Sequence, residues 1–228
     1  MEKEKFGTKY YYTTLKNRLS FEIKSLIGRL FSPSEIISKK NYLELGSGNE
    51  VRKSDKIESL DFYNIGLKNL FSFKNEKIIC HDLRYRLPFK DKAFSGVYLE
   101  HTLEHLYPFE AITLLSEIYR ILKPNGIVRI TVPDLDIYIL EYNKKDRSPH
   151  FKKFENGCEL MWSLTQNFKH YSVWNFEMLK MQLEKKKFEN VVKLKFKEGE
   201  DRNILLDRED RKHETLYVEA KKHLRKTF

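Results

Sequence analysis

Short apolar runs divide the middle of the chain, and each stops at a glycine or an acidic residue. The runs lie at 41–48, 56–63, 76–83, 94–101 and 126–134. Their length and their content of Val, Ile, Leu and Tyr are typical of buried strands. We therefore expect five strands in this part of the chain.

A helix is predicted between the fourth and fifth runs. Its apolar residues recur at helical spacing: Ala111, Leu114, Leu115, Ile118 and Leu122. Pro108 suits its first turn, and "KPNG" at 123–126 ends it. Strands that alternate with helices predict an α/β fold with parallel strands, right-handed crossovers and ligands at the carboxyl ends of the strands.

The flanking segments predict further helices and strands. Apolar residues from Tyr12 to Leu30 form one stripe of a helix that ends before Pro33, and a helix docked on the core is favoured over one at a membrane surface. Another helix, capped by Asn175, is expected at 175–187. Two final strands, near 190–197 and 214–221, flank a polar loop whose length is typical of functional or disordered segments.

Composition indicates a globular protein of the cytoplasm. The chain has 228 residues, two cysteines and a net charge of +10. Two distant cysteines fit a reducing compartment, and neither a signal peptide nor a membrane span is expected. The lysines are scattered along the chain, so nucleic acid is a less favoured partner than the charge alone suggests.

The ends of the first three strands carry residues suited to an adenosine-containing cofactor. The turn Glu44-Leu45-Gly46-Ser47-Gly48 lets a ligand approach the backbone closely. Asp61 ends the second strand, where a carboxylate can accept both ribose hydroxyls. Asp82 ends the third and can take the amino group of an adenine. The set of three is much more specific than the glycine turn alone.

Two dinucleotide motifs are incomplete. Tyr119 and Lys123 have the Tyr-x-x-x-Lys spacing of short-chain dehydrogenases, but they lie on the helix before the fifth strand and Pro124 ends that helix. The glycine-rich pattern also has Val51 at its third glycine position. We interpret Tyr119 as a packing residue and Lys123 as a cation at the helix end.

The stretch "EHTLEHL" at 100–106 matches the H-x-x-E-H motif of inverted zinc proteases. Pro108 follows too closely for the long helix that this motif requires, and no third carboxylate ligand is evident downstream. A zinc protease is therefore not expected.

Three stretches together resemble the class I S-adenosylmethionine-dependent methyltransferases, in particular a small bacterial methyltransferase-type-11-like branch. They are "LELGSG", "HDLRYRLPFKDKAFSGVYLEHTLEHL" and "LLSEIYRILKPNGIVRITVPDL". The resemblance is strong over about 41–140. It implies a Rossmann-like, seven-stranded, mostly parallel sheet with an antiparallel last strand. We expect a methyltransferase domain at 41–228, preceded by an N-terminal amphipathic helical extension at 1–40 that the apolar stripe predicts. Two positions depart from the family pattern, Glu50 and Asn125, where the family has glycine.

The resemblance also implies the site. S-adenosylmethionine would be bound by the residues at the strand ends: Glu44, Gly46, Ser47, Gly48, Asp61, Asp82, Leu83 and Glu100. His101 is the first candidate for a general base and His105 the second, since a neutral imidazole can deprotonate an oxygen acceptor near pH 7. The related branch is associated with sugars of surface polysaccharides, so a small-molecule or glycan acceptor is expected. An RNA methyltransferase, an NAD(P)-dependent oxidoreductase and a non-catalytic cofactor-binding protein remain alternatives.

The same turn also raises the question of whether the protein binds a metal ion. Some small-RNA 2′-O-methyltransferases have a similar carboxylate–x–x–Glu–His turn that holds a divalent ion together with a later histidine. Here Glu104 and His105 match, His101 replaces the first carboxylate, and His170 could return to the site. The nitrogen-rich set would suit zinc better than magnesium. Because no further carboxylate can be placed there, we predict a metal-independent enzyme.

Overall fold

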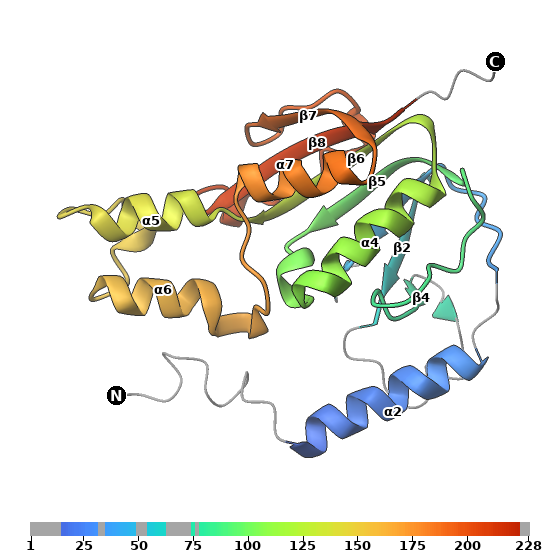
Figure 1. The fold of residues 1–228 in the computed structure, drawn as a ribbon, viewed down its shortest axis with the longest axis horizontal. Coiled ribbons are helices and arrows are strands. Elements are labelled where there is room, and N and C mark those ends of the chain that lie inside the picture. The colour runs from blue at the N-terminus through green and yellow to red at the C-terminus, as the bar shows by residue number, and fades with distance from the viewer. Residues whose placement is uncertain (1–14, 32–34, 49–53, 63–73, 76–77, 224–228) are drawn as a thin grey trace.

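The computed structural model describes residues 15–31, 35–48, 54–62, 74–75 and 78–223. An eight-stranded sheet runs through the molecule in the order β3-β4-β2-β1-β5-β6-β8-β7 (Figure 1). Its strands are β1 (Tyr42–Leu45), β2 (Ile57–Asp61), β3 (Lys74–Asn75), β4 (Ile78–Cys80), β5 (Phe94–Glu100), β6 (Leu122–Pro133), β7 (Phe188–Leu194) and β8 (Thr215–Lys222). The helices are α2 (Leu15–Phe31), α4 (Pro108–Ile121), α5 (Leu135–Asn143), α6 (Gly157–Thr165) and α7 (Phe176–Lys185).

The central strands are parallel, as predicted. β1 pairs with β2 on one side and β5 on the other, and β4 and β6 extend the parallel set outward. β8 is antiparallel to both β6 and β7, which confirms the antiparallel last strand. The sheet has one strand more than predicted, because the two-residue β3 pairs antiparallel with β4 at the edge. The carboxyl ends of β1, β2, β4 and β5 therefore meet along one edge of the sheet.

The main hydrophobic core lies between the sheet and the helices α4 and α7. Leu114 and Ile118 of α4, Leu179 and Leu183 of α7 and Val128 of β6 are all buried in one cluster. α4 begins at Pro108 and ends at Ile121, as its apolar spacing predicts. The Asn175 side chain accepts a hydrogen bond from the Met178 amide, which confirms the predicted cap of α7. These contacts fix β5 and its outgoing turn against the core.

Residues 123–126 were predicted to separate a helix from a strand, but they belong to β6. Leu122 already pairs with Phe94, and the next pair joins Ile127 to Gly96, so the intervening residues form an irregularity in the ladder. Asn125 has φ 62°, a left-handed conformation that asparagine tolerates better than most residues. The helix still ends where expected, and only the start of the strand differs.

The polar loop 198–213 is folded against the sheet. Two short 3₁₀ helices, η4 (Arg202–Ile204) and η5 (Glu209–Arg211), lie within it. Arg129 of β6 is fully buried and donates hydrogen bonds to both carboxylate oxygens of Asp207, at 2.8 and 2.6 Å. The same guanidinium donates to Glu219 of β8 and to the Glu198 carbonyl. Within the structure the loop is thus tied to two strands.

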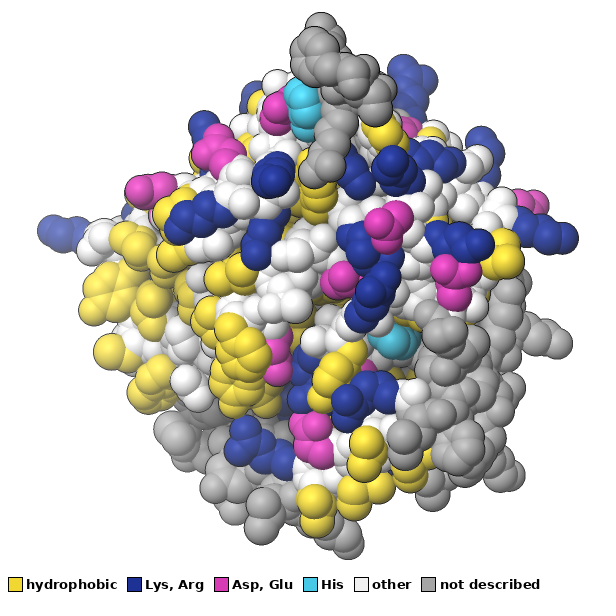
Figure 2. Space-filling model, turned by 45° about the vertical axis from the view of Figure 1, so that its right-hand side comes forward, with side chains coloured by type: hydrophobic (Ala, Val, Ile, Leu, Met, Phe, Trp, Pro, Cys, Tyr) yellow, Lys and Arg dark blue, Asp and Glu magenta, His cyan; other side chains and the backbone are white. Residues whose placement is uncertain are grey.

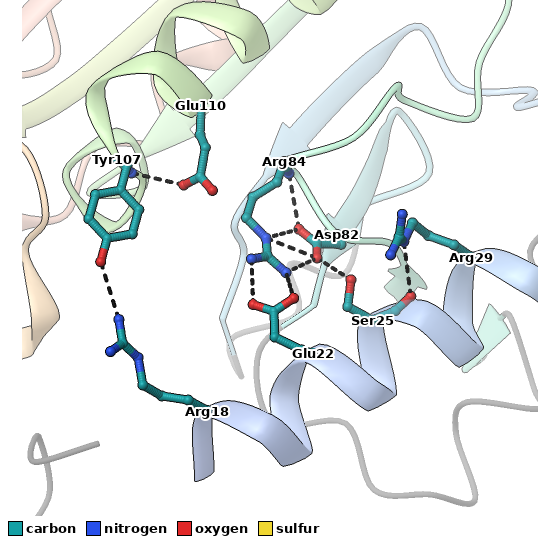
Figure 3. Close-up of polar contacts among 8 residues, drawn as sticks. All are labelled: Arg18, Glu22, Ser25, Arg29, Asp82, Arg84, Tyr107 and Glu110. Carbon is teal, nitrogen blue, oxygen red and sulfur yellow. Dashed lines mark hydrogen bonds and ion pairs between the residues drawn. The ribbon is translucent and has the colours of Figure 1, made fainter. Parts of the chain in front are cut away.

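Helix α2 attaches to the body of the molecule through polar groups (Figure 3). Arg84 pairs with Glu22, and the Ser25 hydroxyl donates to Asp82 at 2.5 Å. Leu19, Ile23 and Leu26 are each about half exposed. The predicted helix is confirmed over its described part, whereas Tyr12 lies outside the described residues. The boundary at residue 40 stays a prediction.

Candidate active site

The predicted cofactor residues converge at the carboxyl edge of the parallel strands. Leu60 and Gly46 are bridged by a backbone hydrogen bond of 2.9 Å, which holds the turn after β1 against the end of β2. The Gly48 amide donates to the Asp61 carboxylate at 2.5 Å. The His81 amide donates to the Asp61 carbonyl, which brings the segment after β4 to the same point. Three successive strand ends therefore form one continuous surface.

The glycine turn is shaped by close approach of a neighbouring side chain. Gly46 has φ +75°, and a Cβ atom added there would lie 2.2 Å from Thr102 Oγ1. Thr102 donates to the carbonyls of Leu45 and Glu100, so it clamps the ends of β1 and β5 together. Gly48 has φ +60°, and nothing lies within 4 Å of its Cβ position. The backbone here can approach a ligand directly.

The remaining cofactor candidates surround this turn. Glu44 is buried and lies 3.4 Å from the Ser59 hydroxyl. The Ser47 hydroxyl oxygen is buried without a hydrogen bond from the part of the chain that the structure describes. Glu100 accepts a hydrogen bond from the Arg208 amide, and Leu83 packs against the main core. Val51 and Glu50, which bear on the dinucleotide pattern, lie outside the described residues.

Asp82 lies at this edge, but its carboxylate is already engaged (Figure 3). Arg84 donates to it from Nε and Nη2, and Ser25 of α2 donates from the other side. Burial alone would raise the pKa of Asp82, but the hydrogen bonds from Arg84 and Ser25 lower it below its ordinary value. An adenine amino group would therefore have to share this carboxylate with two protein donors. Arg84 could have been suspected from its position two residues after Asp82, whereas the sequence gives no signal for Ser25.

The histidine turn leaves β5 in a conformation that no zinc-protease helix could have. His101 has φ 46°, and Leu103–His105 form a single 3₁₀ turn, η1, before α4 begins. His101 and His105 therefore do not occupy successive turns of one α-helix. The sequence prediction against the zinc-protease motif is confirmed.

Both ring nitrogens of His101 are turned toward protein groups, which was not expected of a base facing an acceptor. Its Nε2 lies 2.9 Å from the Thr215 hydroxyl, and that hydroxyl donates to the Arg211 carbonyl. Nε2 must therefore be the donor toward Thr215. Nδ1 lies 3.1 Å from Glu104 Oε1, at an angle that falls short of a hydrogen bond, and the side chain is 8% exposed.

His105 is the more accessible of the two histidines. It is exposed, and its ring meets that of His170 edge-on, with centroids 5.0 Å apart. Tyr107 and Tyr171 stack beside it with ring centroids 4.7 Å apart, and both are partly exposed. The turn thus presents an imidazole and two phenol rings to solvent at the end of β5.

Glu104 is the buried centre of the turn. Burial would raise its pKa, but His101, followed by His105 and His170, lowers it to about 2. The carboxylate is therefore ionised near neutral pH.

The pair with dehydrogenase-like spacing, Tyr119 and Lys123, lies away from the carboxyl edge of the parallel strands. Lys123 Nζ contacts Asn41 Oδ1 and the Ser95 hydroxyl, at the amino ends of β1 and β5. Tyr119 packs edge-on against Phe188 of β7. Both residues are remote from the carboxyl edge, which confirms that their spacing is coincidental.

Comparison with known proteins finds a methyltransferase domain over part of the chain. The family model described as "Methyltransferase domain" matches residues 56–130, from just before β2 into β6. No curated protein matches the sequence. A solved S-adenosylmethionine-dependent methyltransferase from Archaeoglobus fulgidus is 18% identical, with a TM-score of 0.50, over 95% of this chain and 98% of that chain.

Two other solved structures show the range of similar chains. The complex of the Haloferax volcanii Trm112 methyltransferase activator with a methyltransferase contains a chain that is 13% identical, with a TM-score of 0.50, over 98% of this chain and all of that one. The Haemonchus contortus phosphoethanolamine N-methyltransferase 2, bound to phosphomonomethylethanolamine and S-adenosylhomocysteine, is 15% identical, with a TM-score of 0.46. That match covers 98% of this chain and 61% of the longer one.

The methyltransferase-domain match covers less than half of the chain, and the fold is similar to that of solved S-adenosylmethionine-dependent methyltransferases. Both findings favour S-adenosylmethionine over a nicotinamide as the cofactor. Among the described residues no helix is long and apolar enough to cross a membrane.

Proposed function

We propose that the protein transfers the methyl group of S-adenosylmethionine to a small-molecule or glycan acceptor by in-line displacement. The observation that carries this proposal is the convergence of the glycine turn, Asp61 and Glu100 at one strand edge, directly before the histidine turn. The sulfonium is already a good electrophile, so the protein mainly aligns the two reactants and excludes water. The glycine turn and the two carboxylates would hold the cofactor, and residues 101–107 would meet the acceptor.

The surface next to the turn supports a small acceptor with hydroxyl groups. Tyr107 and Tyr171 offer flat apolar faces with polar tips, a combination that suits a ligand with both apolar and hydroxyl-bearing surfaces. Lysine and arginine side chains are interspersed with acidic and hydrophobic ones on the face shown in Figure 2, rather than gathered in one band. A continuous basic band would have favoured RNA as the acceptor.

The two histidines take different parts in this proposal. His101 donates through Nε2 to Thr215, and its Nδ1 is buried beside Glu104, so neither ring nitrogen is open to an acceptor. We assign it a positioning part, in which it orients Glu104 and the turn. His105 is exposed beside the two tyrosines and is the better placed of the two to act on an acceptor hydroxyl.

Calorimetric titration with adenosylhomocysteine tests the cofactor site. Asp61→Asn removes the charge that would accept the ribose hydroxyls, and hydrogen bonds to charged groups contribute about 1.5–3 kcal/mol. Affinity should fall about 10- to 100-fold. Asp55→Asn is the matched control, because this exposed residue precedes the same strand and loses the same charge. Equal affinity in the two variants would remove Asp61 from the site.

The acceptor can be sought among small molecules that copurify with the protein. Mass spectrometry that detects a sugar nucleotide, followed by methylation of that molecule by the wild type, would support a glycan-related acceptor. A protein that binds adenosylhomocysteine yet methylates none of a panel of sugar nucleotides, small hydroxylated molecules and RNA would fit the non-catalytic alternative. Methylation confined to RNA would contradict the proposal.

A further inference from the structure

A distant segment is fastened to the histidine turn by backbone hydrogen bonds. The amides of Tyr171 and Ser172 both donate to the Glu104 carbonyl, at 2.7 and 3.2 Å, and the Ser172 hydroxyl donates to the Leu103 carbonyl. Two successive residues before this point, Phe168 and Lys169, have left-handed backbones with φ 61° and 59°. Left-handed conformations in two consecutive non-glycine residues store strain that the surrounding contacts must support. The result is that His170 lies beside Glu104 and His105.

Glu104 is a buried carboxyl group without hydrogen bonds from the described residues. The residue is 1% exposed, and neither carboxylate oxygen accepts a hydrogen bond from the part of the chain that the structure describes. A buried polar group is costly unless it has a partner. His101 Nδ1 lies 3.1 Å from Oε1, and His101 is outside the cluster of Glu104, His105 and His170. A partner for the carboxylate can therefore be sought on the side of His105 and His170.

Both of these histidines are oriented by backbone carbonyls. His170 Nδ1 lies 2.6 Å from the Leu164 carbonyl, and His105 Nδ1 lies 3.4 Å from the Lys169 carbonyl. A carbonyl oxygen can only accept, so Nδ1 carries the proton in each ring and Nε2 keeps its lone pair. Metal-ligating histidines are usually held in this way, with one nitrogen donating to a carbonyl and the other facing the ion.

We propose that Glu104, His105 and His170 bind a zinc-like divalent transition-metal ion. One potential ligand atom of each lies within 4.8 Å of those of the other two. Two imidazoles and one carboxylate suit zinc and its neighbours and are a poor set for magnesium, which prefers oxygen ligands. His101 is outside the set, because its Nε2 is bonded to Thr215, and it acts instead as the partner that orients the Glu104 carboxylate.

Three protein ligands leave at least one coordination position open, as in catalytic rather than structural zinc sites. That position would take a water or a hydroxyl oxygen, next to the exposed Tyr107 and Tyr171. An ion on His105 Nε2 occupies the lone pair that a base needs, so in the metal-bound protein His105 is a ligand and not the base. This proposal departs from the sequence prediction of a metal-independent enzyme, and it stands whether or not the proposed acceptor class is correct.

Metal binding can be measured without cofactor or acceptor. Protein purified without a histidine tag is stripped with a chelator and titrated with Zn²⁺ against a chromophoric competitor, and Co²⁺ binding is followed by its visible absorption. The wild type should bind one equivalent. His105→Ala, His170→Ala and Glu104→Gln should each weaken Zn²⁺ binding by more than about 100-fold, since even outer partners of such sites contribute about 10- to 100-fold. His150→Ala is the matched control, because His150 pairs with His213 outside the cluster.

His105 is exposed, so its variant is expected to fold even if the buried positions do not tolerate change. Calorimetry with adenosylhomocysteine on the same samples checks this, and unaltered affinity in His105→Ala would show an intact cofactor site. Loss of Zn²⁺ binding in His105→Ala but not in His150→Ala supports the metal site. Zn²⁺ binding that is weak in the wild type, or equal in these two variants, overturns it. Failure of the methyltransfer proposal would appear separately, as absent adenosylhomocysteine binding.

Discussion

Cys80 ends β4 beside the carboxylates assigned to the cofactor. It is partly buried, whereas Cys158 on α6 is exposed. Burial, followed by the charges of Asp61 and Asp82, raises the pKa of the Cys80 thiol to about 11. The only other cysteine of the chain lies far from this edge of the sheet, so the two thiols report on different environments.

Iodoacetamide should therefore label Cys158 well before Cys80. At pH 8, a thiol with a pKa of about 11 has about 100-fold less thiolate than one at the ordinary value of 9.0, and only the thiolate reacts. Peptide mass spectrometry over a time course measures both rates. Saturating adenosylhomocysteine should slow the labelling of Cys80 further and leave the labelling rate of Cys158 unchanged. Equal labelling of the two cysteines would mean that Cys80 is not shielded in this way.

At the residue scale, the sequence predicts residues whose position follows from a local pattern. It does not predict contacts between residues that are far apart in the chain. Asp61 could be predicted because it ends an apolar run and the sheet geometry fixes where that end lies. The bond between Ser25 and Asp82 joins residues 57 positions apart, and the contact of His101 with Thr215 spans 114 positions. No local pattern encodes such pairs. For this reason His101 was expected to face an acceptor, although the fold turns its Nε2 toward Thr215 and its Nδ1 toward Glu104.

Among the elements, α2 is joined to the domain in part by the hydrogen bond from Ser25 to Asp82. Ser25→Ala removes the hydroxyl that donates to Asp82, and hydrogen bonds to charged groups contribute about 1.5–3 kcal/mol. Amide hydrogen exchange in 15–31 should accelerate about 10- to 100-fold, since local opening of the helix sets this rate. Ser20→Ala is the control, because Ser20 is exposed on the same helix and undergoes the same change in helix propensity. Similar acceleration in both variants would show that the contact does not hold the helix.

The elements that the sequence predicts well have a clear apolar pattern. The strands β1, β2 and β5 are short continuous apolar runs that are buried along most of their length, and α4 has one apolar face toward the core. α5 and α6 were not predicted, and the exposure of Ile139, Leu140 and Trp162 gives the reason. Apolar residues on the solvent side remove the contrast between faces from which a helix is recognised. The small second core that holds these helices, around Phe151 and Leu160, is made by tertiary packing.

On the scale of the whole molecule, Arg129 joins the sheet to the 198–213 loop. Arg129→Met keeps an unbranched side chain but leaves Asp207 and Glu219 buried without their cation. Removing one partner of a buried ion pair costs about 3–5 kcal/mol, so the free energy of unfolding in urea should fall by that amount. Lys221→Met is the control, because its pair with Glu200 is exposed and contributes at most about 1 kcal/mol. A loss of less than about 1 kcal/mol in Arg129→Met would show that the buried network adds little to stability.

Helix α2 contacts the domain through charged and polar groups as well as one aromatic ring. Glu22 and Ser25 pair with Arg84 and Asp82, and Phe21 packs edge-on against Phe62. Leu19, Ile23 and Leu26 are each about half exposed. When an ordinary amphipathic helix detaches, it exposes an apolar surface to water. Detachment of α2 would expose carboxylate and guanidinium groups, which hydrate readily. Because ionic contacts attach the helix, raising the salt concentration should screen them and favour its detachment.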